Sequence, residues 1–329
     1  MLSGSQIPLD GAGTPHLDIS AFEAAARRIR PYVNETYLRE ISPGLWVKCE
    51  YEQVTGSFKF RGALNKVLQL DSSARTRGVV CASAGNHGLG VAKSCAIVGI
   101  RCSVYVPASA PAAKTDAILS LGAHLTVVDG GYGLAEMVGL EAARTTGAVW
   151  ISPYNDADVI AGQGTIGLEL ARQFTEAMLS CPLVFIPASG GGLVCGVGLA
   201  LHALGSDARI VGVQTEAAPY LHAALAGLDL ESIEERPTIA DGLAGPIEKG
   251  SVTLSLLARA VERIDLVGEG EIVAAMRWLA DRGTVIEPSA AVALAAARRV
   301  TATTPKVAVL SGSNVDPTLV KSVLSGSDN

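Results

Sequence analysis

Short runs of apolar and β-branched residues alternate along the chain with longer alanine-rich segments, whose apolar positions recur at helical spacing. Short apolar runs of this kind are typical of buried strands, and long periodic segments are typical of helices. The pattern predicts strands at residues 45–51, 79–82, 102–106, 125–128, 148–151, 183–187, 210–214, 264–267 and 307–310. It predicts helices at residues 88–98, 112–121, 133–145, 159–174, 193–204, 269–281 and 289–300.

Alternating strands and helices favour an α/β fold with parallel sheets. A chain of 329 residues, 49% of them hydrophobic, is long enough for one large core or two smaller ones. No proline-rich linker separates two consecutive domains, so we expect the second domain to be inserted in the first. The expected large domain comprises residues 1–72 and 150–329, and the expected small, mobile domain comprises residues 73–149.

The charge pattern favours a small-molecule partner. The net charge is −6 and no long basic run occurs, which argues against nucleic acid and against an acidic membrane surface. Residues 177–206 carry no Asp, Glu, Lys or Arg and are long enough to cross a bilayer. However, Pro187 and the glycines at 190–192 divide this stretch into a predicted strand and a predicted helix, so we expect no membrane span.

The cysteines and the N-terminus indicate a cytoplasmic protein. No CxxC pair occurs, and residues 1–18 have neither the charged region nor the apolar run of a signal peptide. We therefore expect no disulfide framework and predict that the cysteines are small buried apolar residues, namely Cys49, Cys81, Cys95, Cys102, Cys181 and Cys195.

Lys59 stands among small and aromatic residues, between the predicted strand at 45–51 and a helix. An exposed lysine has a pKa near ~10.4 and is almost wholly protonated at neutral pH. Burial and the positive end of a helix both favour the neutral amine, which can attack an aldehyde. Lys59 is therefore a candidate Schiff-base lysine; the alternative is a surface lysine at the start of a helix.

A glycine-rich turn, Ser189-Gly190-Gly191-Gly192-Leu193, follows a predicted strand and opens a predicted helix. Glycines in this position let successive backbone N–H groups converge on an anion, and the helix dipole adds to the attraction. The alternative is a tight turn that binds nothing. Three adjacent glycines exceed what a turn needs, so we favour a phosphate site.

A second turn between strand and helix spans residues 81–88. Its backbone amides can hold a carboxylate, and the Asn86 side chain can donate to a phenolate-like oxygen. The alternative is that Ser83 and Asn86 cap the helix. Ser83 also resembles the nucleophile of a serine hydrolase, but Cys81 stands where that motif requires glycine, which leaves a hydrolase as a distant alternative.

Two further patterns argue against other cofactors. Residues 162–167 fit the dinucleotide motif GxGxxG, but no acidic residue follows at residues 177–206, where the ribose-binding carboxylate belongs. This segment instead predicts a helix with closely packed glycines. The five histidines show no metal-ligand spacing, so no metal site is predicted.

Seven motifs in order carry a resemblance to a known family: TGSFKFRGA, ASAGNHG, VIAGQGTIGLEL, SGGGL, TIADGLA, EPSAAVAL and LSGSN. Together they resemble the fold type II pyridoxal-phosphate enzymes of the threonine/serine dehydratase and serine racemase family. The resemblance covers nearly the whole chain. It implies a tryptophan synthase β-like fold with two parallel-sheet domains, pyridoxal 5'-phosphate as cofactor, and a homodimer.

The resemblance also implies roles for individual residues. Lys59 matches the catalytic lysine that holds the cofactor and abstracts the Cα proton. The residues that it implies for cofactor binding are Phe58, Lys59, Asn86, Ser189, Gly190, Gly191, Gly192, Leu193, Gly242, Glu287 and Ser311. Those that it implies for the substrate carboxylate are Ser83, Ala84, Gly85, Asn86 and His87.

The expected reaction is α,β-elimination. Ser311 matches the residue at the pyridine nitrogen, and a serine there does not enforce a pyridinium as an aspartate would, which favours prompt loss of a β-substituent. We expect a dehydratase that converts L-threonine or L-serine to a 2-oxo acid and ammonia, with other 3-hydroxy amino acids as an alternative. Only residues 316–329 follow the last motif, without the regulatory domain of related biosynthetic enzymes, so we expect a role in amino-acid catabolism.

Several departures bear on the alternatives. Racemases of the family have a serine acid/base where this chain has Ala84, so racemisation is expected to be poor. Gln214 and Tyr220 occupy the places of the metal-binding carboxylates of the serine racemase branch. Ser189 and Ser313 stand where glycine is common. A noncatalytic pyridoxal-phosphate carrier also remains open.

Overall fold

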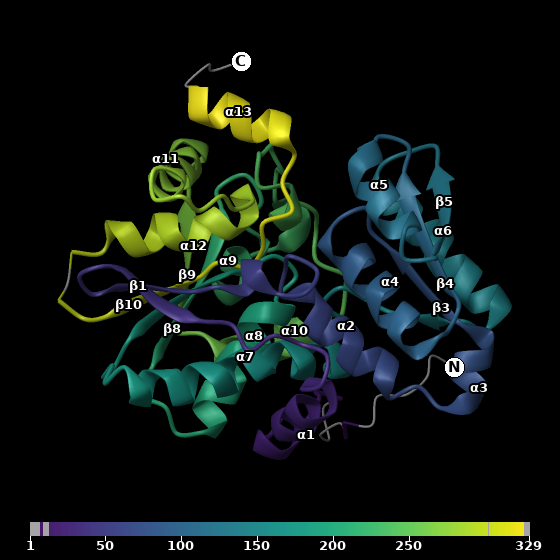
Figure 1. Ribbon diagram of the computed structural model, residues 1–329, viewed down its shortest axis with the longest axis horizontal. Coiled ribbons are helices and arrows are strands. Elements are labelled where there is room, and N and C mark those ends of the chain that lie inside the picture. Colours follow the sequence, from purple (N-terminus) through teal and green to yellow (C-terminus); the bar gives the residue numbers. More distant parts are fainter. Residues whose placement is uncertain (1–6, 9–12, 302, 326–329) are drawn as a thin grey trace.

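The structure, a computed structural model, describes residues 7–8, 13–301 and 303–325, and its strands form two sheets (Figure 1). The larger sheet has the order β1-β2-β10-β7-β8-β9 and is parallel except for the pairing of β1 with β2. Its strands are β1 (Leu38–Ser42), β2 (Leu45–Lys48), β7 (Leu183–Pro187), β8 (Arg209–Thr215), β9 (Arg263–Val267) and β10 (Lys306–Val309).

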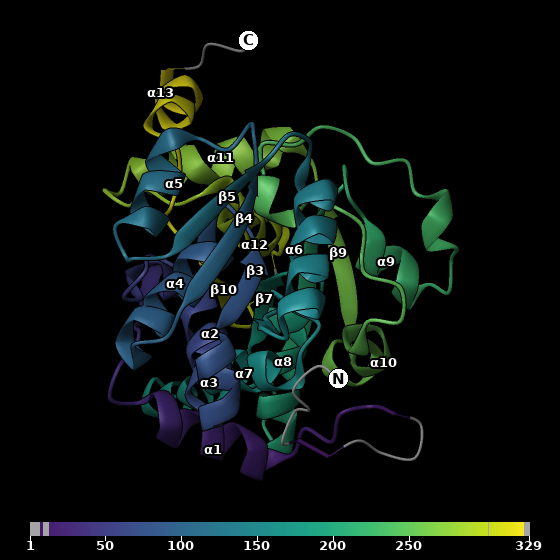
Figure 2. The same ribbon diagram turned by 90° about the vertical axis from the view of Figure 1, so that its right-hand side faces the viewer.

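The smaller sheet has the order β5-β4-β3-β6 and is wholly parallel. Its strands are β3 (Val79–Ala82), β4 (Cys102–Pro107), β5 (His124–Val128) and β6 (Val149–Trp150). Together with α4, α5 and α6 it forms a lobe beside the larger sheet, as the two perpendicular views show (Figures 1 and 2). All strands of this sheet come from one continuous stretch of chain.

Helices cover both sheets. They are α1 (Ile19–Ile29), α2 (Lys59–Leu68), α3 (Ser72–Arg77), α4 (Asn86–Val98), α5 (Ala112–Leu119), α6 (Tyr132–Thr146), α7 (Ala157–Glu176), α8 (Gly192–Ala203), α9 (Tyr220–Leu225), α10 (Val252–Ala260), α11 (Glu269–Ala280), α12 (Pro288–Arg299) and α13 (Pro317–Ser325). Short 3₁₀ helices lie at η1 (Glu50–Glu52), η2 (Leu230–Ser232) and η3 (Asp241–Leu243).

The central strand β7 shows how the large sheet is buried. Val184 and Ile186 pack into one apolar cluster with residues of α7 and α8, whereas Leu183 and Phe185 pack into a second cluster with residues of α11 and α12. Successive side chains of a strand point to opposite faces, so a strand with helices on both faces is apolar throughout. This two-sided burial accounts for the long uncharged stretch seen in the sequence.

A buried cluster of charges fixes α2 to the large sheet. The fully buried Arg61 donates from Nε and Nη2 to the two carboxylate oxygens of Glu50 at 2.8 Å each, and from Nη1 to Glu169 Oε1 at 2.6 Å. Lys48 Nζ also forms an ion pair with Glu169. Because Arg61 lies two residues after Lys59, this cluster holds the start of α2 in place.

The glycines of the GxGxxG segment lie inside α7, which confirms the prediction of a closely packed helix. A Cβ atom on Gly162 would lie 2.6 Å from the Cα of Gly62 in α2, and one on Gly167 would lie 2.7 Å from the carbonyl oxygen of Val197 in α8. These glycines therefore serve the approach of helices rather than a dinucleotide.

Some expectations were wrong in detail. The strand predicted at residues 45–51 ends at Lys48, because the chain turns into η1. The antiparallel edge strand β1 was not predicted, since its side chains are mostly polar and none is fully buried. Cys181 is exposed, contrary to the prediction that the cysteines are buried; the other five are buried and free.

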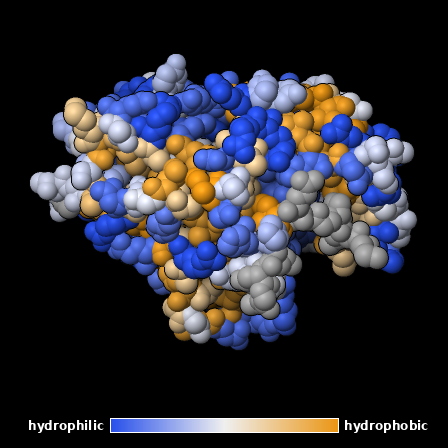
Figure 3. All heavy atoms as spheres, turned by 90° about the horizontal axis from the view of Figure 1, so that it is seen from below, coloured by the Kyte–Doolittle hydropathy of each residue, from blue (hydrophilic) through white to orange (hydrophobic). Residues whose placement is uncertain are grey.

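Among the described residues, no helix is long and apolar enough to cross a membrane. The face seen from below mixes apolar and polar residues (Figure 3). Residues 1–6 and 9–12, which belong to the N-terminal stretch expected to lack a signal peptide, lie outside the described residues.

Candidate functional site

Lys59 is the first residue of α2, and its side chain is only partly exposed. Its Nζ donates a hydrogen bond to the carbonyl oxygen of Pro153 at 3.0 Å and lies 5.1 Å from the centre of the Phe58 ring. Burial lowers the pKa of Lys59 to about 8, against the opposing effect of the nearby Glu287 carboxylate. A substantial fraction of this amine is therefore neutral near physiological pH.

The glycine turn lies between β7 and α8, next to the segment that receives Lys59. Gly191 has φ +93°, and a Cβ atom there would lie 2.9 Å from the Cβ of Thr253. A Cβ atom on Gly190 would lie 2.3 Å from the ring of Tyr154, the residue after Pro153. Pro153 contacts the lysine and Tyr154 contacts the glycine turn, so these two residues connect the two parts of the site. The close approach of Tyr154 and Thr253 is by itself a sufficient reason for glycine at positions 190 and 191.

The same turn leaves polar groups for a ligand. The first amides of a helix have no acceptor within the helix, and α8 begins at Gly192, so its start is suited to an anion. The Ser189 side chain is half-buried, and its hydroxyl makes no hydrogen bond to any other residue that the structure describes. Leu193 is buried beneath the turn.

The turn between β3 and α4 places Asn86 at the start of α4. The N-cap of this helix is Gly85, and no side chain caps the helix. Ser83 Oγ accepts from the N–H of Gly85 at 3.1 Å, so Ser83 stabilises the turn and does not cap the helix. Asn86 does not cap the helix. Its Nδ2 donates to both carboxylate oxygens of Glu287 at 2.9 Å. Ala84, within the turn, is partly buried.

Asn314, which the sequence analysis did not single out, fixes the orientation of the Asn86 amide. Its Nδ2 donates to Asn86 Oδ1 at 2.7 Å and to the carbonyl oxygen of Thr55 at 2.8 Å. With Oδ1 of Asn86 occupied in this way, the NH₂ group of Asn86 must face Glu287. Its place in the LSGSN motif was the one signal that could have identified Asn314.

Glu287, one of the residues predicted to bind the cofactor, directly precedes α12. Burial raises the pKa of Glu287 to about 7, although the hydrogen bond from Asn86 acts in the opposite direction. A Cβ atom on Gly312 would lie 2.6 Å from Glu287 Oε1, so the LSGSN turn approaches it closely. Gly242 is held to the same helix, because its N–H donates to Ser289 Oγ at 3.0 Å.

Ser311 is buried, and its carbonyl oxygen accepts a hydrogen bond from the N–H of Phe58 at 3.0 Å. Its hydroxyl makes no hydrogen bond to any other residue in the described part of the chain. The end of β10 is thus linked to the residue before Lys59, and a hydroxyl there remains for a ligand.

His87 is a neutral imidazole, whose buried Nδ1 has no hydrogen-bond partner among the described residues. Its Nε2 lies 2.8 Å from the Ile151 carbonyl oxygen, to which it donates, and burial lowers the pKa of His87 to about 3, so the ring stays neutral. The hydroxyl of Ser83 has its one hydrogen bond among the described residues from Gly85 N–H. No base contacts Ser83 in that part of the chain, which argues against the serine hydrolase alternative.

Comparison with known proteins agrees with this geometry. Residues 29–312 match the family model described as pyridoxal-phosphate dependent enzyme. The chain belongs to this family. It is 36% identical to the L-threonine ammonia-lyase of Thermotoga maritima, over 94% of this chain and 78% of that protein. It is 34% identical to the serine racemase of Oryza sativa subsp. indica, over 85% of this chain and 83% of that protein.

The fold agrees as well. The structure of maize serine racemase superposes with a TM-score of 0.84 at 33% identity, over 94% of this chain and 97% of that one. The family, the type II fold and the cofactor inferred from the seven motifs are thereby confirmed. The residues fit pyridoxal phosphate. The partly neutral amine of Lys59 suits its aldehyde, the start of α8 suits its phosphate, and the buried Ser311 has a hydroxyl without a partner among the described residues.

Among the described residues, no three His, Cys, Asp or Glu side chains are close enough together to hold a metal ion. Two of the positions compared with the racemase branch have other partners. Gln214 Oε1 accepts the N–H of His222 at 2.8 Å, and the Tyr220 hydroxyl donates to Glu235 Oε2 at 3.0 Å.

Proposed function

We propose that this protein is a pyridoxal-phosphate-dependent ammonia-lyase that converts a 3-hydroxy amino acid, L-threonine or L-serine, to a 2-oxo acid and ammonia. The observation that carries the proposal is Lys59. Its amine is partly buried, has a lowered pKa and lies beside Phe58, next to the segment that packs on the glycine turn.

In this proposal the chain binds the cofactor from three sides. Lys59 and Phe58 lie at the aldehyde and the ring, and the start of α8 with Ser189 to Leu193 binds the phosphate. Ser311 would bind the ring nitrogen, and Asn86, which also donates to Glu287, would bind the ring oxygen. Gly242 lies against the start of α12, where its N–H donates to Ser289 Oγ. When bound, pyridoxal phosphate supplies an acceptor for the electron pair left at the substrate Cα.

The chain itself holds the substrate and moves the proton. The backbone amides of Ala84, Asn86 and His87, at the start of α4, hold the substrate carboxylate. Those of Ser83 and Gly85 already donate, to the carbonyl oxygen of Tyr105 at 3.1 Å and to Ser83 Oγ at 3.1 Å. Lys59 Nζ, once the substrate's amino group has displaced it, takes the proton from Cα. The 3-hydroxyl group leaves with one proton as water, which balances the proton taken from Cα, and later hydrolysis consumes one water and releases ammonia and the 2-oxo acid.

The relatives support the substrate. Two of them are named L-threonine ammonia-lyase, from Thermotoga maritima and Geobacter sulfurreducens, at 36% and 35% identity. L-Threonine is therefore the first substrate to test and L-serine the second. Another 3-hydroxy amino acid is the alternative within the same reaction class.

Serine racemase is the second candidate, because relatives with that name match over 85% of the chain. Ala84 argues against it. Its methyl side chain offers no proton to the face opposite Lys59. Chiral chromatography after incubation with L-serine separates the two functions: pyruvate without D-serine supports the lyase, and abundant D-serine supports the racemase.

The experiment that tests the proposal combines absorbance and product formation. The purified protein with pyridoxal phosphate should show the absorbance of bound cofactor and release 2-oxobutanoate from L-threonine. Lys59→Ala should abolish release, whereas Lys321→Ala, at an exposed position of α13, should not change it. Bound cofactor without release from L-threonine or L-serine would move the search to other 3-hydroxy amino acids, and no bound cofactor would refute the proposal.

We further propose that residues 73–149 move as a small domain against residues 1–72 and 150–329, that the enzyme is a homodimer, and that it is cytoplasmic. Two contacts between the lobes support closure over the site: Asn86 with Glu287, and the ion pair of Lys114 Nζ with Asp241 Oδ2 at 3.2 Å. Closure of this kind excludes water from the reaction. Light scattering of the purified protein tests the dimer.

A further inference from the structure

Residues 152–155 form the segment that receives the side chain of Lys59. Lys59 Nζ donates to the carbonyl oxygen of Pro153 at 3.0 Å, and the ring of Tyr154 lies 2.3 Å from where a Cβ atom on Gly190 would be. The segment therefore contacts both the amine and the glycine turn. A group that holds this segment in place also sets the position of the amine relative to the phosphate site.

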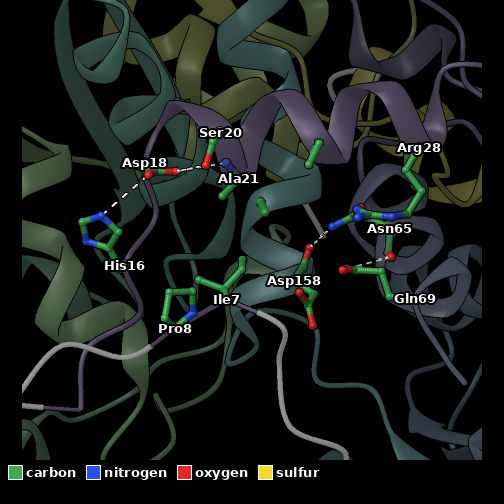
Figure 4. Close-up of a pocket in the computed structure, with 12 residues that line it drawn as sticks. Ile7, Pro8, His16, Asp18, Ser20, Ala21, Arg28, Asn65, Gln69 and Asp158 are labelled. Atoms are coloured by element: carbon green, nitrogen blue, oxygen red, sulfur yellow. Dashed lines mark hydrogen bonds and ion pairs between the residues drawn. The ribbon is translucent and has the colours of Figure 1, made fainter.

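The two ends of the segment are fixed by neighbouring elements. On one side, the N–H of Ile151 donates to the carbonyl oxygen of Val80 in β3 at 2.9 Å. On the other side, Asn65 of α2 donates from Nδ2 to the carbonyl oxygen of Asp158 at 2.6 Å, at the wall of a small pocket (Figure 4). Neither contact includes residues 152–155, so the middle of the segment depends on other groups.

Glu248, in the loop before α10, binds the middle of the segment at three points. Its Oε1 accepts from Ser152 Oγ at 3.2 Å, its Oε2 accepts from Asn155 Nδ2 at 2.7 Å, and its backbone N–H donates to the Tyr154 hydroxyl at 2.9 Å. Within the part of the chain that the structure describes, Glu248 and Lys59 are the residues outside the segment whose side chains hydrogen-bond to it. The carboxylate thus holds the segment on both sides of Pro153.

The Glu248 carboxylate has no cation as a partner among the described residues. The side chain is half-buried, and the adjacent Lys249 pairs with Glu231 instead, at 3.8 Å. A partly buried carboxylate without a cation depends on neutral donors. Its two side-chain donors both come from residues 152–155, and hydrogen bonds to an ionised acceptor are roughly twice as strong as neutral ones.

The same loop also binds the glycine turn. The N–H of Val252 donates to Asn155 Oδ1 at 2.9 Å, and the hydroxyl of the buried Thr253 donates to the carbonyl oxygen of Gly190 at 2.7 Å. Residues 248–253 therefore contact the segment and the glycine turn at once. This loop fixes the separation between the amine and the phosphate site.

We propose that Glu248 is a positioning residue, which acts through the carbonyl oxygen of Pro153 to hold the amine of Lys59 where it meets the substrate. The inference rests on the proposed lyase function. When the amine is free, this carbonyl oxygen accepts one of its hydrogens and so directs the nitrogen lone pair. The proton moves from the substrate Cα to Nζ, and its bonding electrons pass to the bound cofactor. Glu248 itself touches neither substrate nor cofactor.

The test compares the wild-type holoenzyme with Glu248→Ala, using L-threonine with hydrogen or deuterium at Cα. Loss of the carboxylate removes two charge-assisted hydrogen bonds, so kcat for 2-oxobutanoate release should fall at least about tenfold. KM should change little, because the amides at the start of α4 remain. The isotope effect on kcat should not fall below that of the wild type, because proton transfer is the step that slows.

Two further measurements separate positioning from stability. Glu248→Gln keeps the length of the side chain and one oxygen acceptor, so it should recover part of the lost kcat. In cofactor-free protein, a fluorescence titration with pyridoxal phosphate should show weaker binding by Glu248→Ala, because the loop at 248–253 also holds the glycine turn.

Glu271→Ala is the matched control. The Glu271 carboxylate also fixes a loop to a helix start, since it accepts from the N–H of Gly268 at 3.0 Å and pairs with Arg299, but neither partner contacts residues 152–155. This change should lower the melting temperature and leave kcat, the isotope effect and cofactor affinity unchanged.

Wild-type kcat and cofactor affinity in Glu248→Ala would overturn the proposal, and so would losses equal to those of Glu271→Ala or a smaller isotope effect. If Glu248→Ala does not fold, Glu248→Gln keeps the test decisive, because loss of the charge should still lower kcat. If the wild-type protein itself releases no 2-oxo acid, the proposed function fails, whereas the titration of cofactor-free protein still tests the role of Glu248.

Discussion

Replacing Asn314 with aspartate should turn the amide of Asn86 around. In the wild-type protein the NH₂ group of Asn314 donates to Asn86 Oδ1 at 2.7 Å, which leaves the NH₂ group of Asn86 to donate to Glu287. Aspartate can only accept, so it would draw the NH₂ group of Asn86 toward itself. Asn86 would then present its oxygen, instead of a donor, to Glu287 and to the proposed position of the cofactor's ring oxygen.

The size of the effect follows from the lost donor. A hydrogen bond to a charged group contributes about 1.5–3 kcal/mol, and about 1.4 kcal/mol corresponds to a factor of ten in rate or binding. We therefore expect kcat/KM for 2-oxobutanoate release from L-threonine to fall roughly ten- to a hundredfold in Asn314→Asp. Asn314→Ala, which frees the Asn86 amide without reversing it, should lose less.

A double-mutant cycle with Asn86→Ala tests whether Asn314 acts through Asn86. If it does, Asn314→Asp should have little further effect on kcat/KM in the Asn86→Ala background. The absorbance spectrum of the bound cofactor should also shift in Asn314→Asp. A variant that is only less stable would show a lower melting temperature but no such spectral shift. Wild-type kcat/KM in Asn314→Asp, or additive losses in the double mutant, would show that Asn314 does not orient the Asn86 amide.

Three further predictions concern the glycine turn, the buried charges and the lysine. Gly191→Ala, at φ +93° and close to Thr253, should lower both the melting temperature and the affinity for pyridoxal phosphate. The control is Gly227→Ala, at φ +72° with no atom within 4 Å of its added Cβ, which should leave cofactor affinity unchanged. Equal losses of affinity in the two variants would contradict this. Arg61→Met leaves Glu50 buried without its cation and should lower the free energy of unfolding in urea by about 3–5 kcal/mol, against less than about 1 kcal/mol for Arg39→Met in a more exposed pair. Only the neutral amine attacks an aldehyde, and burial lowers the pKa of Lys59 to about 8. The rate at which cofactor-free protein takes up the cofactor should therefore rise with pH and level off above about pH 8. A rate that keeps rising toward pH ~10 would indicate an ordinary exposed lysine.

The parts of the site that the sequence predicted are those with local signals. Lys59, the glycines at 190–192 and the turn before Asn86 each stand between a strand and a helix, and their types are set by the chain immediately around them. The glycines of α7 were also interpreted correctly, because the expected acidic residue was missing from the sequence after them. Local chemistry of this kind can be recognised before any fold is known.

The contacts between distant segments could not be predicted. Glu287 was named through the resemblance, but its contact with Asn86, 201 residues away, was not, and Asn314, 228 residues from Asn86, was not singled out at all, since no local pattern connects these residues. The partner of Lys59 is a backbone carbonyl, which any residue at position 153 would supply. The edge strand β1 was missed for a different reason: its polar, partly exposed side chains lack the apolar pattern by which buried strands are recognised.

The most direct test of the central claim is to find which amine carries the cofactor. Borohydride reduction of the loaded protein fixes the pyridoxyl group to that amine, and peptide mass spectrometry then identifies the modified residue. We expect one modified peptide, containing Lys59, and none in Lys59→Ala. Modification at another lysine, or scattered over several, would contradict it.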